Sequence, residues 1–257
     1  MRYMFGQDPN IQWQVLDISA SEIPNVAQVI VSVGAQQPPI RLYVTPDGEH
    51  AIVGEVIPFG ADPFAPARHK LEAEAHGVAR GAAKPAVTLV EFSDLQCPHC
   101  KVGQPIIDKL LQDFPDARLI FQPFPLAMHK WAMKAAAAAE CVAQQNSAAF
   151  WKFIQSVYEA QETITEANAD QTFAGLATAA GVNAQKTAAC SASPDTARRV
   201  QQSLELGKAV GVNSTPTLFV NGRRVPGVKD VPYESLKALV TFAASGKTPP
   251  LPTPAPR

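Results

Sequence analysis

The first quarter of the chain alternates apolar and polar residues at the spacing of β-strands. Residues 26–33 form a strand-like run rich in valine, and every second residue of 40–44 is aliphatic. The turn sequence Pro46-Asp47-Gly48 follows, and residues 51–53 offer another apolar run, so this region predicts a β-hairpin. We therefore expect a small β-rich domain over residues 1–60.

The next segment, 61–84, lacks such a pattern, and we expect it to be a linker. Prolines break its start, and the charged stretch 67–78 can form a short helix. His69, Glu72 and His76 would share one face of that helix, as metal ligands do. A solvated linker helix explains them better, so we assign no metal site there.

Strand and helix patterns alternate from residue 85 onward. Residues 87–92 predict a buried strand, a helix follows from Cys97 or Pro98, and residues 118–124 predict the next strand, which completes a β-α-β unit. The remaining predicted elements are helices over 130–144, 149–160, 168–180 and 195–210, strands over 217–220 and 223–225 around the turn Asn221-Gly222, and a helix over 232–244.

This order predicts an α/β domain over residues 85–245 that carries an α-helical insert. The tail 246–257 holds five prolines and no apolar stripe, so we expect it to be disordered.

Composition narrows the class of protein. A chain of 257 residues with 46% hydrophobic content can bury a substantial core. Its formal net charge of −1 gives no reason to expect nucleic acid or an anionic membrane as partner. No apolar run approaches the roughly 20 residues of a membrane-spanning helix. Residues 1–5 lack the features of a secretory signal, so the compartment has to be inferred from the chemistry.

Cys97 and Cys100 are separated by two residues, a spacing used both by zinc half-sites and by redox pairs. Structural zinc usually needs two such pairs, but Cys141 and Cys190 stand alone and the five histidines are scattered. A Cys-Pro-His-Cys turn after a buried strand places Cys97 at a helix N-terminus, where free N–H groups stabilise a thiolate. The pattern favours a redox pair and leaves a zinc-binding interaction module as the alternative.

Each residue of this turn can be given a role. Cys97 is expected to attack as the thiolate, and Cys100 to resolve the mixed disulfide. Pro98 suits the first helical turn, where its missing N–H costs nothing. His99 adds a hydrogen-bond donor and partial positive charge, which would lower the pKa of Cys97 and make the disulfide a stronger oxidant. The alternative for His99 is an exposed turn residue.

Glu91 lies in the apolar strand, six positions before Cys97. Burial there would raise the pKa of its carboxyl group. Such a group can accept and return the proton of Cys100. The alternative is a glutamate at the end of the strand that reaches solvent.

Two segments resemble the thioredoxin superfamily, and within it the DsbA-type thiol-disulfide oxidoreductases. They are Glu91–Cys100 and Val212–Gly222. The resemblance implies a thioredoxin fold with an α-helical insert, preceded here by the β-rich domain. It also implies that Pro216 is a cis proline lying against the active-site disulfide and that the Thr215 backbone pairs with a substrate peptide.

The resemblance also bears on the remaining cysteines. Some DsbA-like proteins carry a second pair at such positions, which implies a structural disulfide between Cys141 and Cys190 that adds a few kcal/mol. Two buried free thiols are the alternative. We expect no catalytic role for this pair, because neither residue begins a helix within a Cys-x-x-Cys turn. The resemblance implies no cofactor and no metal.

The hairpin 41–48 is similar to the N-terminal domain of dimeric DsbC-type isomerases. That similarity implies a homodimer in which two Cys97 sites face a shared cleft; the alternative is an extension packed on the catalytic domain.

The sequence as a whole predicts a protein thiol-disulfide oxidoreductase, an oxidase or isomerase, that acts on protein substrates with thiols or disulfides. A membrane redox partner would reoxidise or reduce it. A structural disulfide places it in the periplasm or elsewhere outside the cytoplasm. A thioredoxin-fold transferase or isomerase acting on small thiol conjugates is the second alternative, and Cys100 argues against it because that class commonly keeps a single catalytic cysteine or serine.

Overall fold

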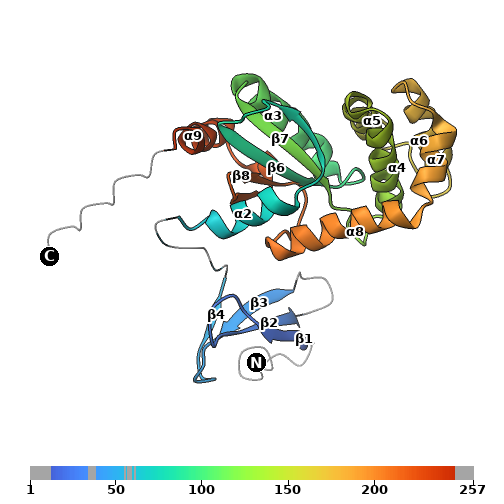
Figure 1. Cartoon of the computed structure of the whole chain (residues 1–257). Helices are drawn as coiled ribbons and strands as arrows, with labels where there is room; N and C mark the ends of the chain where they lie inside the picture. Colours follow the sequence, from blue (N-terminus) through green and yellow to red (C-terminus); the bar gives the residue numbers. More distant parts are fainter. Residues whose placement is uncertain (1–12, 34–38, 55, 57–59, 61, 247–257) are drawn as a thin grey trace. The chain divides into compact units, whose positions relative to one another are not determined.

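The computed structural model describes residues 13–33, 39–54, 56, 60 and 62–246. The chain separates into two compact units, Met1–Phe59 and Gly60–Arg257 (Figure 1). The proline-rich end of the chain, for which the sequence predicts disorder, lies outside the described residues beyond Gly246.

The first unit contains a four-stranded antiparallel sheet in the order β1-β2-β3-β4. Its strands are Trp13–Ala20, Ala27–Val33, Ile40–Val44 and Ala51–Val53. The hairpin expected around Gly48 joins β3 to β4, and Gly48 has a φ of 71°, a conformation that glycine adopts without steric cost.

Strand β1 has no counterpart among the predicted strands. Its register with β2 shifts between Val15 and Asp17, as in a β-bulge. Val15 pairs with Val31 and Asp17 with Ile30, so Leu16 is the extra residue, and the two consecutive apolar residues Val15 and Leu16 interrupt the alternation by which a half-exposed strand is recognised.

The second unit is built on a five-stranded sheet in the order β5-β7-β6-β8-β9. Its strands are β5 (Val78–Gly81), β6 (Val87–Ser93), β7 (Ala117–Pro123), β8 (Thr217–Val220) and β9 (Arg223–Pro226). Strands β6 and β7 are parallel, and the other neighbours are antiparallel. Helix α3 (Pro98–Asp113) connects the parallel pair and forms the predicted β-α-β unit.

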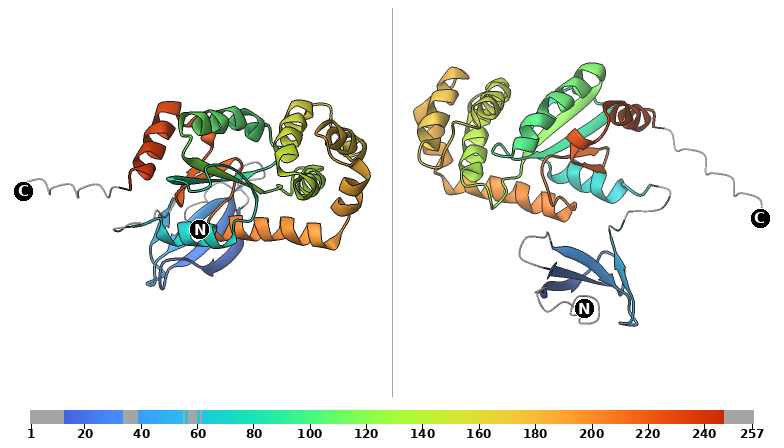
Figure 2. Two further views of the ribbon diagram at one scale, coloured as in Figure 1. Left: turned by 45° about the horizontal axis from the view of Figure 1, so that its top comes forward. Right: turned by 180° about the vertical axis from the view of Figure 1, so that it is seen from behind.

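Helices cover both faces of this sheet, as Figure 2 shows. Helix α3 and helix α9 (Tyr233–Ala244) share one apolar core with β6, β7 and β8. Helix α2 (Ala65–Glu74) and helix α8 (Pro194–Ala209) lie on the opposite face, where Leu71 and Leu206 pack with Phe92 and Phe219. Strand β6 lies in the middle of the sheet between these two layers, so residues that follow it start from a rigid base.

The segment expected to be a linker, 61–84, contributes two elements to the second unit. Helix α2 buries Leu71 against the sheet, and β5 pairs with β7 at the edge of the sheet. The packing of α2 could not be predicted from its highly charged sequence, because Leu71 is its one buried residue. Strand β5 has only four residues, and its pairing with β7 depends on residues about 40 positions away.

Four helices lie between β7 and α8 and form the insert predicted by the sequence. They are α4 (Ala132–Gln145), α5 (Ser147–Ala160), α6 (Ala169–Ala179) and α7 (Ala184–Ser191). Helix α7 was not predicted, because it is short and buries only Thr187. Its start is fixed by the Asn183 side chain, which accepts a hydrogen bond from the Lys186 backbone N–H at 2.8 Å.

Among the described residues, none of the helices combines the length and apolar character needed to cross a bilayer.

Candidate active site

The two sulfur atoms of the Cys-x-x-Cys turn lie where β6 ends and α3 begins. Cys97 is the N-cap residue of α3, and its carbonyl oxygen accepts hydrogen bonds from the N–H groups of Cys100 at 3.1 Å and Lys101 at 3.2 Å. Both cysteines are free thiols, with exposed fractions of 4% for Cys97 and 0% for Cys100. Pro98 and His99 lie at the surface between them. The turn therefore presents Cys97 at the edge of the core and keeps Cys100 inside it.

The two thiols have opposite pKa shifts. A hydrogen bond from the Cys100 side chain is the largest cause that lowers the pKa of Cys97, to about 5, with further contributions from Thr215 and from the backbone N–H groups of Cys100 and His99. Burial raises the pKa of Cys100 well above its usual range, and the neighbouring Cys97 raises it further. At neutral pH Cys97 is thus a thiolate and Cys100 a protonated thiol.

The loop before β8 lies against Cys97, although 118 residues separate them. The Thr215–Pro216 peptide bond is cis, and Cys97 Sγ lies 3.5 Å from the Thr215 carbonyl oxygen, to which it can donate when it is protonated. Gly103 of α3, one helical turn after Cys100, leaves room for this loop, because a Cβ atom on residue 103 would lie only 3.1 Å from Pro216 Cγ. The structure therefore brings the Thr-Pro segment and the cysteine turn together.

Glu91 lies within β6, fully buried. Within the described part of the chain, neither of its carboxylate oxygens has a hydrogen-bond partner. Burial is the main cause that raises the pKa of Glu91 to about 7; the Ser93 hydroxyl lowers it, Asp108 raises it and Arg80 lowers it. Arg80 and Asp108 form an ion pair at the edge of the same region. A carboxyl group with a pKa near neutrality can both take up and release a proton.

Ser93 lies near both Glu91 and Cys100 and influences the pKa of each, which the sequence alone did not indicate. It follows Glu91 by two residues and so lies on the same face of β6. Its hydroxyl lowers the pKa of both Glu91 and Cys100, and it forms a hydrogen bond of 2.9 Å with the Tyr158 hydroxyl from α5. Burial raises the pKa of Tyr158 far above its usual range, so Tyr158 stays protonated and can donate.

A buried aspartate organises the loop that leads to Cys97. The Asp94 carboxylate accepts from the backbone N–H of Gln96 at 2.7 Å, from that of Leu126 at 2.8 Å and from His129 Nδ1 at 2.7 Å. The Asp94 backbone N–H donates to Cys100 Sγ at 3.4 Å. A loop held by this many hydrogen bonds fixes the position of both sulfur atoms. An acidic residue three positions before a Cys-x-x-Cys turn was the available signal in the sequence.

The insert supplies the surroundings of this site. Cys97 and Cys100 share one apolar core with Trp131, Phe150 and Phe153 of the insert and its approach. Gln161, directly after α5, donates from Nε2 to the Leu95 carbonyl at 2.8 Å and to the Cys97 carbonyl at 3.1 Å.

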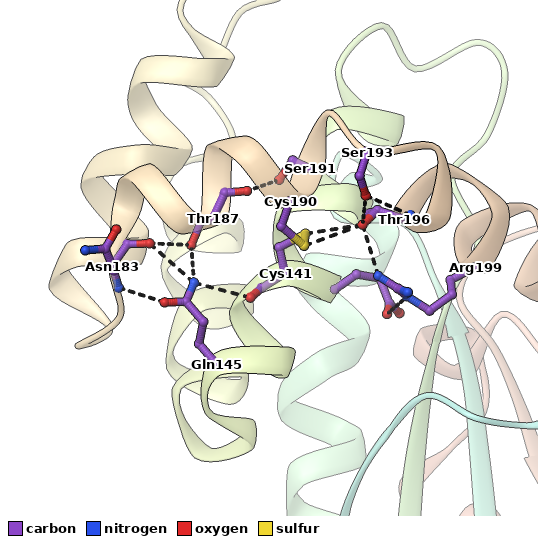
Figure 3. The surroundings of a disulfide bond; sticks show 10 residues. Cys141, Gln145, Asn183, Thr187, Cys190, Ser191, Ser193, Thr196 and Arg199 are labelled. Atoms are coloured by element: carbon purple, nitrogen blue, oxygen red, sulfur yellow. Dashed lines mark hydrogen bonds and ion pairs between the residues drawn. A yellow bond between two sulfur atoms is a disulfide. The ribbon is translucent and has the colours of Figure 1, made fainter.

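The two remaining cysteines form a disulfide bond within the insert (Figure 3). Cys141 of α4 and Cys190 of α7 have Cα atoms 5.8 Å apart and are 49 residues apart in the sequence. Helices α4 and α7 are thereby joined covalently. Over the described residues, His, Cys, Asp and Glu side chains form no cluster of three or more suited to a metal ion.

Comparison with known proteins gives the family. The sequence model of the family described as Thioredoxin matches residues 73–241. Disulfide bond formation protein D of Bacillus subtilis is 29% identical over 166 residues, which are 63% of this chain and 74% of that protein. A crystal structure of oxidised BdbD from Bacillus subtilis has a TM-score of 0.60 at 24% identity and covers 68% of this chain and 95% of that one.

A relative with a different name also matches part of this chain. The Na(+)/H(+) antiporter NhaA 1 of Salinispora arenicola is 32% identical over 168 residues, 65% of this chain. The match spans only about a quarter, 24%, of the length of the antiporter. The family model covers well over half of the present chain, and its range contains the cysteine turn, the insert and the Thr-Pro loop. The chain therefore belongs to the thioredoxin family.

Proposed function

We propose that this chain is a thiol-disulfide oxidoreductase that exchanges disulfides with protein substrates through Cys97 and Cys100. The observation that carries the proposal is the opposite shift of the two thiols within one helix turn. A low pKa makes Cys97 a good nucleophile and a good leaving group, and a high pKa keeps Cys100 protonated until it is needed. The name of the Bacillus subtilis relative, a disulfide bond formation protein, agrees with this chemistry.

In the oxidising direction, a substrate thiolate attacks Cys97 Sγ in the Cys97–Cys100 disulfide. The sulfur–sulfur bond breaks, and Cys100 leaves with the electron pair. Glu91, whose pKa of about 7 keeps it partly protonated at neutral pH, supplies the proton for Cys100 with Ser93 as its neighbour. A second substrate thiolate then attacks the substrate sulfur of the mixed disulfide, and Cys97 leaves as a stable thiolate. The substrate gains a disulfide, and the chain becomes a dithiol.

The substrate we propose is an extended protein segment with accessible thiols. The Thr215 backbone lies beside Cys97 and is suited to pair with such a segment, with Pro216 next to the reacting sulfur. His99 lies at the surface of the turn, where its ring can face the incoming chain. A peptide held there would bring its sulfur to Cys97.

The setting we propose is extracytoplasmic, in the periplasm or its equivalent. The Cys141–Cys190 disulfide supports this, because such bonds persist in oxidising compartments and are rare in the cytosol. A membrane-bound redox partner would restore the Cys97–Cys100 pair after each turnover. The match to 24% of the antiporter's length gives no ground for ion transport by this chain.

We further propose that the first unit pairs two copies of the chain. Strand β1 is an edge of its sheet and exposes Val15, Leu16 and Ile18, while Ile52 and Val53 of β4 are exposed at the other edge. Exposed apolar edge strands favour association with another strand. The molecular mass in solution tests this: a dimer supports it, and a monomer at micromolar concentration contradicts it.

Trapping of a mixed disulfide tests the catalytic proposal. The chain with Cys100→Ser cannot resolve, so it should accumulate a covalent adduct with an activated cysteine peptide, located at Cys97 by mass spectrometry. The matched variant Cys97→Ser should form none, and the unmodified chain should convert a reduced dithiol protein to its disulfide. Adducts that form equally in both variants would refute the assignment. Stoichiometric zinc that is lost on alkylation would instead support the zinc-binding alternative.

A further inference from the structure

The disulfide between Cys141 and Cys190 lies beside a buried hydroxyl group. Thr196 Oγ1 is 3.5 Å from each sulfur atom, and the Thr196 side chain is fully buried (Figure 3). Cys141 is buried within α4, whereas Cys190, near the end of α7, is only partly buried. The two sulfur atoms therefore differ in exposure and share one polar neighbour.

The hydrogen-bond pattern of Thr196 determines where its proton points. A hydroxyl group has one proton to donate and two lone pairs that accept. Thr196 Oγ1 accepts from the Ser193 hydroxyl at 3.1 Å and from Arg199 Nη2 at 3.0 Å. Ser193 Oγ in turn accepts from the Thr196 backbone N–H at 3.2 Å, so its own proton is available for Thr196. With both lone pairs occupied, the Thr196 proton is directed at the two sulfur atoms.

This arrangement favours the reduced state of the pair. Sulfur in a disulfide is a weak acceptor, whereas a thiolate carries a full charge and accepts much more strongly. The Arg199 guanidinium adds positive charge on the far side of the Thr196 hydroxyl. Glu140 Oε2 lies 3.7 Å from Arg199 Nε and offsets part of that charge. A disulfide bond with a purely structural role would not be stabilised by such a donor, because disulfide sulfur accepts hydrogen bonds only weakly.

We propose that Cys141–Cys190 is a second redox centre, a disulfide that an external dithiol reduces while the chain stays folded. A thiolate of the dithiol attacks the more exposed Cys190 Sγ, the sulfur–sulfur bond breaks, and the electron pair leaves on Cys141 Sγ, where Thr196 donates. The second thiol of the reductant then attacks the mixed disulfide and releases Cys190. The reductant departs as a disulfide, oxidised by two electrons. One of its two protons remains on Cys190 and the other is released to solvent, so that Cys141 stays a thiolate that accepts from Thr196. This goes beyond the proposed function, which uses only the first pair.

The test isolates the second pair. The full chain with Cys97→Ser and Cys100→Ser is equilibrated with mixtures of reduced and oxidised dithiothreitol, and the thiols of Cys141 and Cys190 are trapped by alkylation and counted by mass spectrometry. Adding Thr196→Val removes the hydroxyl at nearly constant volume, and Thr196→Ser restores it. We expect Thr196→Val to lower the equilibrium constant for reduction about tenfold, because the variant loses a hydrogen bond to a charged acceptor. Thr196→Ser should keep the equilibrium constant of the parent chain.

The sign separates this proposal from a purely structural role. If Thr196 only supports packing, Thr196→Val weakens the folded oxidised chain and makes reduction easier, which would overturn the proposal. An unchanged equilibrium constant, or reduction that occurs only with denaturant present, would also overturn it. With glutathione as the probe, the trapped adduct should map to Cys190, and an adduct on Cys141 would contradict the order of attack. If the double variant does not fold, peptide mapping of the same titration in the unmodified chain gives the same readout.

Discussion

The hydrogen bond from Cys100 to Cys97 can be removed without touching Cys97 itself. Replacing Cys100 with alanine deletes the largest cause of the low Cys97 pKa. A hydrogen bond to a charged acceptor contributes about 1.5–3 kcal/mol, and a change of one pKa unit corresponds to about 1.4 kcal/mol. Cys100→Ala should therefore raise the pKa of Cys97 by about one to two units, from about 5 to about 6–7.

The assay for this change is the rate of alkylation by iodoacetamide as a function of pH. Cys97 is the only free thiol in the variant, because Cys141 and Cys190 are bonded to each other. The matched control is Cys100→Ser, whose hydroxyl can still donate and should leave the midpoint closer to that of the unmodified chain. An alkylation midpoint in Cys100→Ala that stays near 5 would refute the assignment of the donor, and a midpoint near 9 in the unmodified chain would refute the low pKa altogether.

Three further results are expected. The pKa of Glu91 is about 7 in the folded chain and 4.5 in an ordinary glutamate, so between these pH values the unfolded chain loses this proton while the folded chain keeps it. The free energy of unfolding of the unmodified chain should therefore fall relative to that of Glu91→Gln by about 3 kcal/mol as the pH rises from 4.5 to 7, measured by urea unfolding. A difference between the two chains that does not depend on pH would contradict this. Asp94→Ala leaves three donors without their acceptor and should lower the free energy of unfolding by about 2–4 kcal/mol, so a loss below about 0.5 kcal/mol would count against the loop network. Phe153→Ala opens a cavity in the core shared with Cys97 and should cost about 3–5 kcal/mol in the same assay, and a cost under about 1 kcal/mol would show that this core tolerates the gap.

Local patterns predicted the parts of the fold that depend on neighbouring residues. The hairpin turn is an example: Asn221 and Gly222 have φ angles of 45° and 86°, the left-handed values that a two-residue type I′ turn needs. The buried strand before the cysteine turn was equally clear, because it carries apolar side chains on both faces, Leu89 on one and Val90 and Phe92 on the other. Strands β1 and β5 were not found, since one carries a bulge and the other is a four-residue edge strand stabilised by distant pairing.

The site shows the same division. The cysteine turn, Glu91 and the Thr-Pro loop could be named from the sequence because each belongs to a recognisable segment, and the structure places that loop against Cys97. The contacts of Ser93 with Tyr158 and of Asp94 with His129 join residues 65 and 35 positions apart, and they depend on how the insert and the loop after β7 pack. No local pattern in the chain encodes such contacts.

The reduction potential of the Cys97–Cys100 pair is the most direct measure of the proposed oxidising role. A thiolate with a pKa of about 5, compared with about 7 in thioredoxin, favours the reduced form about fiftyfold more at pH 7, which is about 50 mV for a two-electron couple. Equilibration of the chain with glutathione buffers, read by mass mapping of Cys97 and Cys100, should therefore give a potential about 50 mV above the roughly −270 mV of thioredoxin. A potential at or below that of thioredoxin would contradict an oxidising role for this site.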